Sequence, residues 1–246
     1  MLTVLGTSLL SAVCIVVTGC GRIHGRPGPA PNVARPEEVL DVRTLYKANC
    51  AACHGAEGKN GAAISLANPV YLAVAGEDNI DRVIANGVPN KLMPPFARSA
   101  GGMLTDRQVT AIAHGILGEW REPGLIAGQP APPYRVTLTG DSEHGRQAFA
   151  VSCARCHGGA GEGSSGDSRI GARHLGSIVD PIYLALVSDQ YLRSVTIAGR
   201  PDQGMPDWRG DSAQPLTDRE VTDIVTWLAS KRIANPGQPY SPHPNR

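Results

Sequence analysis

Two short segments of the chain share the pattern Cys-x-x-Cys-His, in which a histidine directly follows the second of two cysteines. The residues of the two copies are Cys50, Cys53, His54, Cys153, Cys156 and His157. Two cysteines at this spacing can form thioether bonds to the two vinyl groups of a haem, and the adjacent histidine can reach its iron. The pattern therefore predicts two covalently attached haem c groups, one at each copy.

Two other uses of the same residue types are a structural zinc site and a redox-active dithiol. A zinc site built on Cys-x-x-Cys needs two more ligands from a second pair, whereas each copy supplies only three candidates. A redox dithiol does not account for a histidine directly after the second cysteine in both copies. Both stay as alternatives to the haem that we favour.

A haem iron held by one histidine takes a sixth ligand, and we expect methionine at both sites. Met93 and Met205 lie 112 positions apart, and a proline follows each of them. Met103 has no counterpart, because proline occupies position 215. The predicted axial ligands are therefore His54 with Met93 and His157 with Met205.

The two motifs belong to an internal repeat. Their histidines are 103 positions apart, whereas the later matching segments are 112 apart. These segments are 68–72 with 180–184, 93–94 with 205–206, and 104–107 with 216–219. The change in spacing predicts a nine-residue insertion between Gly158 and Val179, in a loop that accommodates it at small cost.

The repeat predicts the same helices in each half. An opening helix, about 36–51 or 141–154, ends at the haem motif, and a second helix lies near 80–86 or 189–198. A closing helix follows Thr105 or Thr217 as the N-cap residue, with an aspartate in its first turn. Its apolar residues recur at helical spacing and should be buried. They are Val109, Ile112, Ile116, Val221, Ile224, Val225 and Leu228.

Length and composition limit the possible partners and the size of the core. The 246 residues, of which 41% are hydrophobic, suffice for two small domains. A net charge of +1 with 18% charged residues gives no basic surface for nucleic acid, so we expect no nucleic-acid partner. Only 4% of residues are aromatic, while 29 are glycine and 20 are proline, which is typical of loop-rich domains built around a bulky cofactor.

The N-terminus predicts export. Residues 1–19 contain no charged side chain and include an apolar stretch, which indicates a signal sequence. Residues 17–20, Val-Thr-Gly-Cys, resemble a bacterial lipobox, so Cys20 is the predicted lipidation site. Plain secretion and an uncleaved membrane helix are the alternatives. In the case of the membrane helix, Arg22 and Arg26 would hold the haem motifs in the cytoplasm, where haem is not attached to Cys-x-x-Cys-His. The expected location is the periplasmic side of a bacterial membrane, with a lipid anchor.

Composition along the chain predicts its division into segments. These are an export or lipoprotein signal in 1–19, a flexible tether in 20–35, a first domain in 36–123, a proline-rich linker in 124–139, a second domain in 140–234 and a C-terminal tail in 235–246.

Each half of the repeat resembles a class I cytochrome c domain. The resemblance rests on the two haem motifs and the downstream Met-Pro pairs, and it covers about 36–120 and 141–232. It implies an all-α fold of two tandem small helical domains, each wrapped around one covalent haem. Such domains often have a Gly-Pro segment past the histidine, whose carbonyl orients that histidine. Here residues 62–64 and 171–173 lie in that region without the proline.

The resemblance and the motifs lead to electron transfer as the main hypothesis. The chain would serve as a membrane-tethered carrier or as the cytochrome subunit of a respiratory or dehydrogenase complex, with redox proteins or a membrane respiratory complex as partners. In either role it would not itself be an enzyme, and no catalytic residue is expected. The alternative is a dihaem enzyme such as a peroxidase-like oxidoreductase, which needs an open or displaceable sixth position on one iron. A gas or redox sensor is a third hypothesis, although no signalling domain is visible.

Overall fold

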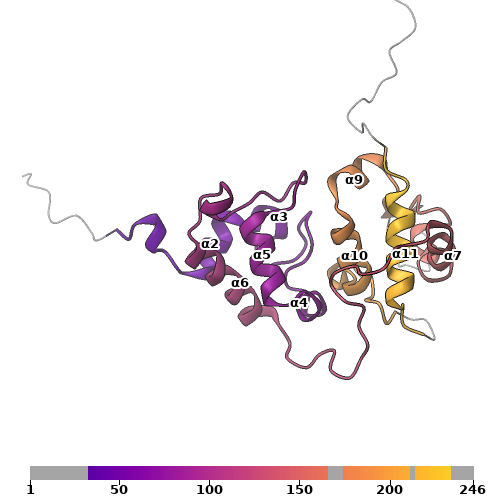
Figure 1. Ribbon diagram of the computed structural model, residues 1–246, viewed down its shortest axis with the longest axis horizontal. Coiled ribbons are helices and arrows are strands. Elements are labelled where there is room, and N and C mark those ends of the chain that lie inside the picture. Colours follow the sequence, from indigo (N-terminus) through magenta and orange to yellow (C-terminus); the bar gives the residue numbers. More distant parts are fainter. Residues whose placement is uncertain (1–32, 166–173, 211–213, 234–246) are drawn as a thin grey trace, which may run out of the picture. The chain divides into compact units, whose positions relative to one another are not determined.

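The computed structural model of the chain describes residues 33–165, 174–210 and 214–233 (Figure 1). The N-terminal unit (Met1–Glu38) contains the single-turn helix η2 (Pro36–Glu38) in its described part. The other described elements belong to the unit Val39–Arg246, which includes both halves of the repeat. The predicted signal, Cys20, most of the tether and the C-terminal tail lie outside the described residues.

Both halves of the repeat consist of helices in the same order. The first half contains α2 (Val42–Asn49), α3 (Ala51–His54), α4 (Pro69–Ala75), α5 (Glu77–Asn86), η3 (Arg98–Ala100) and α6 (Asp106–Trp120). The second half contains α7 (Ser142–Ser152), α8 (Ala154–His157), α9 (Pro181–Leu186), α10 (Asp189–Ala198), η5 (Pro201–Gln203) and α11 (Asp218–Ala229). A two-residue antiparallel pair, β1 (Ser164–Ser165) with β2 (His174–Leu175), lies in the loop between Gly158 and Val179 that is predicted to hold the insertion. The all-α fold class is confirmed.

The closing helices α6 and α11 begin where the sequence predicts. Thr105 and Thr217 are their N-cap residues, and each forms a reciprocal capping box, with Gln108 and Glu220 respectively. Every apolar residue predicted for the core face of these helices is buried. Helix α6 packs against α2 and α5, and α11 packs against α7 and α10 (Figure 1).

The opening helices differ from the prediction in the first half. The prediction of a single helix from Pro36 is wrong. The short helix η2 ends at Glu38, and α2 begins only at Val42, after its N-cap residue Asp41. Helix α7 begins after its Asp141 cap, as expected. In both halves the opening helix ends at the first cysteine of the motif, Cys50 or Cys153, and the rest of the motif forms a separate helical turn.

Helices α4 and α9 were not predicted as helices, although their segments match across the repeat. Each begins with a proline, Pro69 or Pro181, directly after a capping residue. Proline is favoured at the first helical position, because its missing N–H has no partner there in any case. The caps are Asn68 and Asp180, and the side chain of each accepts two backbone N–H groups.

The hydrophobic core does not divide evenly between the two halves. One cluster contains the buried residues of α2, α4, α5 and α6 together with four residues of the second half, Ile197, Ala198, Trp208 and Val221. A second cluster contains Ala148, Phe149, Leu184, Leu192, Ile224, Val225, Trp227 and Leu228. Part of the second half is therefore buried in the core of the first.

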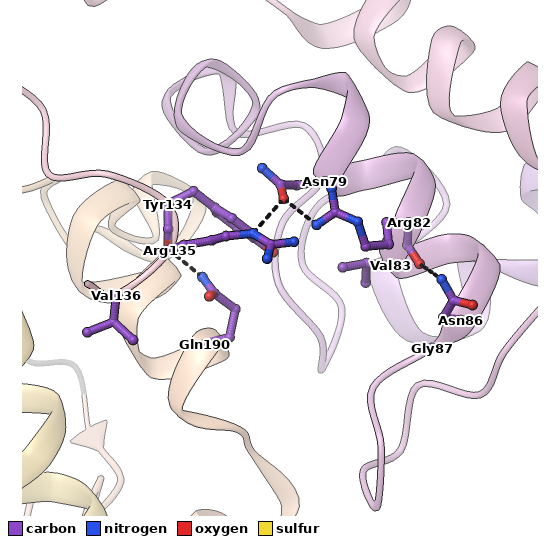
Figure 2. Close-up of a pocket in the computed structure, with 9 residues that line it drawn as sticks. All are labelled: Asn79, Arg82, Val83, Asn86, Gly87, Tyr134, Arg135, Val136 and Gln190. Atoms are coloured by element: carbon purple, nitrogen blue, oxygen red, sulfur yellow. Dashed lines mark hydrogen bonds between the residues drawn. The ribbon is translucent and has the colours of Figure 1, made fainter. Parts of the chain in front are cut away.

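The linker between the halves is held by hydrogen bonds at its centre. The backbone carbonyl of Tyr134 accepts a bond from the side chain of Gln190 (2.9 Å), and that of Pro133 accepts one from Arg193 (2.7 Å). The side chain of Tyr134 packs against the core cluster that contains Tyr71. Figure 2 shows this part of the linker between α5 and Gln190 of α10, beside a pocket of about 400 Å³. Tyr134 thus contacts both halves.

Arg193, which holds the linker, is 2% exposed. It forms an ion pair with Asp218 and donates to the hydroxyl of Thr222 (3.0 Å). The residue 112 positions earlier is Asp81, which bonds to Thr110 instead (3.1 Å). The arginine that binds the linker therefore belongs to the second half alone.

Candidate haem sites

The first motif presents its histidine in a fixed orientation. His54 ends α3 and is mostly buried, and its Nδ1 lies 2.8 Å from the carbonyl oxygen of Ile64. Burial lowers the pKa of His54, although the bond to the carbonyl opposes this effect. A neutral ring that donates from Nδ1 leaves Nε2 as the nitrogen available to iron. Residues 62–64 therefore supply the orienting carbonyl without a Gly-Pro segment.

The cysteines of the motifs are free thiols; Cys50 is buried and Cys53 is exposed, whereas Cys153 and Cys156 are both partly buried. Burial raises the pKa of Cys50 to about 11, and the pKa of Cys153 is raised to about 11 by the same cause. A redox-active dithiol needs a thiol with a lowered pKa, because the thiolate is the nucleophile. These environments therefore disfavour the dithiol alternative and leave the thiols suited to a structural attachment.

The histidine of the second motif has fewer contacts than His54 in the described residues. Nδ1 of His157 is buried and has no hydrogen-bond partner in that part of the chain. Residues 171–173, expected to orient it, lie outside the described residues. At the repeat spacing of 112 positions, the residue that matches Ile64 is Gly176. Burial also lowers the pKa of His157, which favours the neutral ring that a metal ligand requires.

A pair of aromatic side chains packs beside each haem motif. The hydroxyl of Tyr46 donates to the carbonyl of Gly55 (2.8 Å), and its ring meets Trp120 edge-on at 5.4 Å between centroids. In the second half Phe149 contacts Trp227 at 4.6 Å. Burial raises the pKa of Tyr46 to about 12, so its hydroxyl stays protonated. Both tryptophans therefore act as packing residues beside the haem motifs.

The two Met-Pro loops are held by tight turns that the sequence analysis missed. Helices α5 and α10 end at Gly87 and Gly199, with φ of 63° and 67°. A side chain on either glycine would lie within 2.7 Å of a carbonyl oxygen, that of Met93 or of Met205. Only glycine combines this backbone conformation with such a close approach. The two glycines are also 112 positions apart, so the repeat could have revealed them.

The methionines differ in their surroundings. Met93 packs against the core cluster that contains Cys50, whereas Met103 is 79% exposed. Met205 is partly buried and, in the described residues, is not among those packed against the cluster beside Cys153. The structure thus brings the first motif and its predicted methionine into one core and does not do so for the second.

In residues 33–165, 174–210 and 214–233, no three His, Cys, Asp or Glu side chains are grouped as metal ligands. Among the helices that the structure describes, none has the length and apolar character needed to span a bilayer.

Free thiols, an oriented neutral histidine and a glycine-anchored methionine loop fit a covalently held haem in the first half, and the second half repeats their order. This arrangement defines the class of tandem c-type cytochromes. The model of the family described as cytochrome c oxidase, cbb3-type, subunit III matches residues 37–114 and 140–228. The chain belongs to this family, and its cofactors are two haem c groups.

Curated proteins with similar sequences carry related names. The chain is 31% identical over 198 residues to the cbb3-type cytochrome c oxidase subunit FixPc of Rhizobium leguminosarum bv. viciae, covering 76% of this chain and 58% of that protein. It is 28% identical over 212 residues to the subunit CcoP of Rhodobacter capsulatus, covering 80% and 65%. A cytochrome bc1 complex cytochrome c subunit of Corynebacterium diphtheriae is 21% identical over 236 residues, with 90% and 78% covered. The chain thus spans less than two thirds of the length of the two oxidase subunits.

Proposed function

We propose that the chain transfers electrons through its two haem c groups as the cytochrome subunit of a membrane respiratory complex. The observation that carries this proposal is the presence of two haem motifs in one compact unit (Val39–Arg246) of a chain that belongs to the oxidase subunit family. The relatives named as cbb3-type oxidase and bc1 complex subunits support an oxidase or a bc1-type complex as the partner. The chain itself would carry electrons, while another subunit would perform the catalysis.

Specific residues of the chain would hold the two cofactors. Thioether bonds would form at Cys50, Cys53, Cys153 and Cys156, and the axial ligands would be His54, Met93, His157 and Met205. When bound, each haem supplies a site that stores and releases one electron. The protein orients the histidines, anchors the methionine loops through glycine turns and surrounds the sites with apolar side chains.

The same proposal includes the division of the chain into a first haem domain in 36–123, a linker in 124–139 and a second haem domain in 140–234. The family model begins and ends within these ranges, which supports the division.

Removal of one haem at a time tests electron transfer through both. The double variants Cys50→Ala with Cys53→Ala, and Cys153→Ala with Cys156→Ala, should each keep one haem that chemical reductants still reduce. We expect both variants to lose donor-to-acceptor turnover, because each interrupts the route. Turnover that stays unchanged in either variant would mean that the haems are independent carriers.

We also propose export to the periplasmic side of the membrane with a lipid on Cys20. Two or more acyl chains give stable membrane anchoring, whereas one chain is marginal. Mass spectrometry of the N-terminal peptide of the native protein should find a lipid-modified Cys20, and Cys20→Ser should release a soluble protein that is still red. An unmodified N-terminal peptide would rule the anchor out.

A further inference from the structure

Residues 199–206, which we call the Met205 loop, contact the first half of the repeat through a buried amide and a buried ion pair that have no counterpart at the Met93 loop. We propose that the first half positions the Met205 loop, so that ligation by Met205 depends on these buried contacts between the halves more strongly than ligation by Met93 does. The inference rests on the proposed function only in taking Met205 as an axial ligand. Its residues act by positioning the loop and do not touch the reacting iron.

A buried amide of the first half binds the beginning of the loop. The side-chain nitrogen of Asn68 donates to the carbonyl oxygens of Ala198 (2.9 Å) and Gly199 (3.3 Å). Its oxygen accepts the N–H groups of Val70 (3.0 Å) and Tyr71 (3.2 Å) at the start of α4. Asn68 is 2% exposed, so these bonds replace all contact with water. One side chain thus caps a helix of the first half and fixes the end of α10.

A buried ion pair holds the body of the loop. The side chains of Arg200 and Asp202 lie 3.1 Å apart and are 9% and 6% exposed. The backbone of Arg200 exchanges two hydrogen bonds of 3.0 Å with that of Met205. Any movement of Arg200 is therefore transmitted directly to Met205.

The ion pair also reaches the first half. Nη2 of Arg200 lies 3.4 Å from the carbonyl oxygen of Gly61, and Oδ2 of Asp202 accepts the backbone N–H of Asn60 (3.2 Å). Breaking a buried pair leaves an uncompensated charge, so both side chains favour this one arrangement.

Gly61 belongs to the segment that covers the first haem motif. A side chain at this position would lie 2.2 Å from the carbonyl oxygen of Cys53, and the next residue but one, Ala63, donates its N–H to that same oxygen (2.9 Å). The Met205 loop is thus linked through Arg200 to the backbone around the first motif.

Apolar packing supports the same conclusion. Trp208 follows the loop closely and is 1% exposed, and its backbone N–H donates to the carbonyl of Ile197 (2.8 Å). Both residues belong to the core cluster that α2, α4, α5 and α6 build in the first half. The loop therefore begins and ends next to residues buried in the core of the first half.

The Met93 loop lacks the corresponding ion pair, and it contacts the second half through a hydrogen bond from Nζ of Lys91 to the carbonyl oxygen of Ala185 (2.6 Å). The residues 112 positions before Arg200 and Asp202 are Val88 and Asn90, and neither is charged.

The cap of α9 shows the same asymmetry. Asp180 matches Asn68 and caps its helix in the same way, with two bonds of 2.9 Å. It is exposed, and a carboxylate cannot donate to a carbonyl as the amide of Asn68 does.

This asymmetry supplies a pair of isosteric variants. Asn68→Asp keeps the cap of α4 but replaces the two bonds to the end of α10 with repulsion between oxygens, whereas Asp180→Asn keeps the cap of α9 and is the matched control. The readout is the far-red charge-transfer band that methionine bound to ferric haem gives. Asn68→Asp should lose about half of the band of the full chain, because one of two haems loses its methionine. Asp180→Asn should keep all of it.

The same readout in a Met93→Ala background assigns the loss to the second haem. There Asn68→Asp should abolish the remaining band and open that haem to carbon monoxide. If Asn68→Asp fails to fold, Asp202→Asn is the second variant. It removes the negative charge from the ion pair with Arg200 without changing the size of the side chain, and it should weaken the band in the same direction. A band that stays intact in both variants would overturn the inference. Absence of any far-red band in the unaltered protein would instead contradict the proposed ligands.

Discussion

The methionines separate into two groups by their anchoring and exposure. Met93 and Met205 each follow a glycine turn that fixes the backbone of the loop, whereas Met103 is 79% exposed and has no counterpart in the repeat. Ligation of iron requires a side chain held in one place, since a mobile thioether on the surface would leave the sixth position open. The local structure therefore favours the aligned pair.

Single substitutions of the three methionines test this choice. We expect Met93→Ala to open only the first haem and Met205→Ala only the second, because each removes one axial ligand. Carbon monoxide binding to the reduced protein should rise from near zero to about one per chain in either variant. Met103→Ala is the control and should bind none; if it opens the first haem, the alignment of the Met-Pro pairs is wrong.

The residues of the haem motifs could be named from the sequence alone, because thioether attachment demands a fixed local spacing. The carbonyl that orients His54 could be narrowed to residues 62–64, and it belongs to Ile64. The contacts of Asn68 and Arg200 could not be predicted. Their partners lie more than 100 positions away in the chain, and no periodic pattern records such pairs.

Local sequence signals predicted the closing helices correctly but missed α4, α9 and the start of α2. Thr105 and Thr217 were identified because a capping threonine and an apolar periodicity occur together. Helices α4 and α9 are short, so their apolar residues complete too few turns to show a helical period. Their Asn-Pro and Asp-Pro starts were the available signal. The start of α2 was missed because Pro36 and Asp41 both mark helix beginnings, and only the second begins α2.

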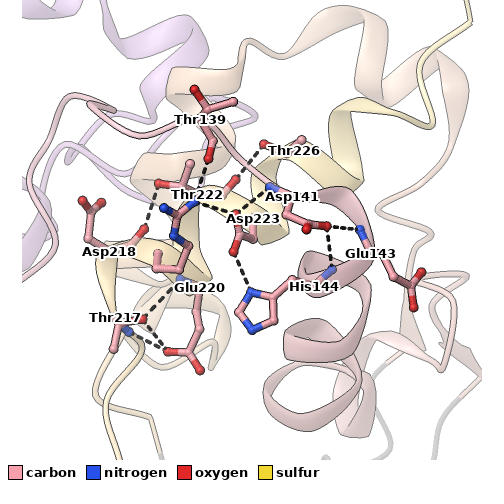
Figure 3. A network of polar contacts seen from close by, with 11 residues as sticks. Thr139, Asp141, Glu143, His144, Thr217, Asp218, Glu220, Thr222, Asp223 and Thr226 are labelled. Atoms are coloured by element: carbon pink, nitrogen blue, oxygen red, sulfur yellow. Dashed lines mark hydrogen bonds and ion pairs between the residues drawn. The ribbon is translucent and has the colours of Figure 1, made fainter.

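Helices α7 and α11 are joined by a polar network around a buried carboxylate (Figure 3). Asp223 is fully buried, and it binds Nδ1 of His144 (2.6 Å) and the backbone N–H of Asp141 (2.7 Å). Burial alone would raise the pKa of Asp223, but the bonds from His144 and Asp141 and the charge of Arg219 hold it below its usual value. The hydrogen bond to Asp223 raises the pKa of His144, and the nearby charges of Asp141 and Glu220 act in the same direction.

This network predicts a pH dependence of stability. Because the pKa of His144 is raised on folding, its stabilising contribution is fully present below about pH 6.5 and is lost as the pH rises through the folded pKa. Urea unfolding of the native protein and of His144→Gln should therefore give midpoints that differ most at acidic pH and converge as the pH rises. His114→Gln, an exposed histidine 3.4 Å from Glu77, is the control. A difference that stays constant with pH would contradict the role of His144.

Within the unit Val39–Arg246, the linker is bound to the folded halves and does not only connect them. Sequence composition predicts a proline-rich connection, but Arg193 binds its backbone carbonyls and Tyr134 contacts both halves. The buried arginine was not recognisable from the sequence, since the matching position of the first half is an aspartate. The shared core and the held linker fix one half against the other within Val39–Arg246.

Removal of the arginine should loosen this connection. Arg193→Gln leaves Asp218 without its ion pair and the linker carbonyls without a charged donor, so we expect the free energy of unfolding to fall by about 3 kcal/mol or more. Proteolysis within the linker should become faster. Arg219→Gln is the control, because Arg219 also donates to a linker carbonyl, that of Thr139, but is half exposed and lies 3.7 Å from the carboxylate of Asp223, which keeps its bonds to His144 and Asp141. It should cost less than about 1 kcal/mol. Equal effects of the two changes would contradict the account of the linker.

Electrons that pass between two haems held in one chain should do so at a rate that belongs to the single molecule, and this rate of internal electron transfer can be measured. A light-activated reductant can reduce one haem in a small fraction of molecules, and the redistribution of the electron can then be followed by absorbance. Because the halves share a core and a held linker, we predict a first-order rate that does not change when the protein concentration is raised tenfold. A rate that rises in proportion to concentration would show that electrons pass between chains and would contradict the account.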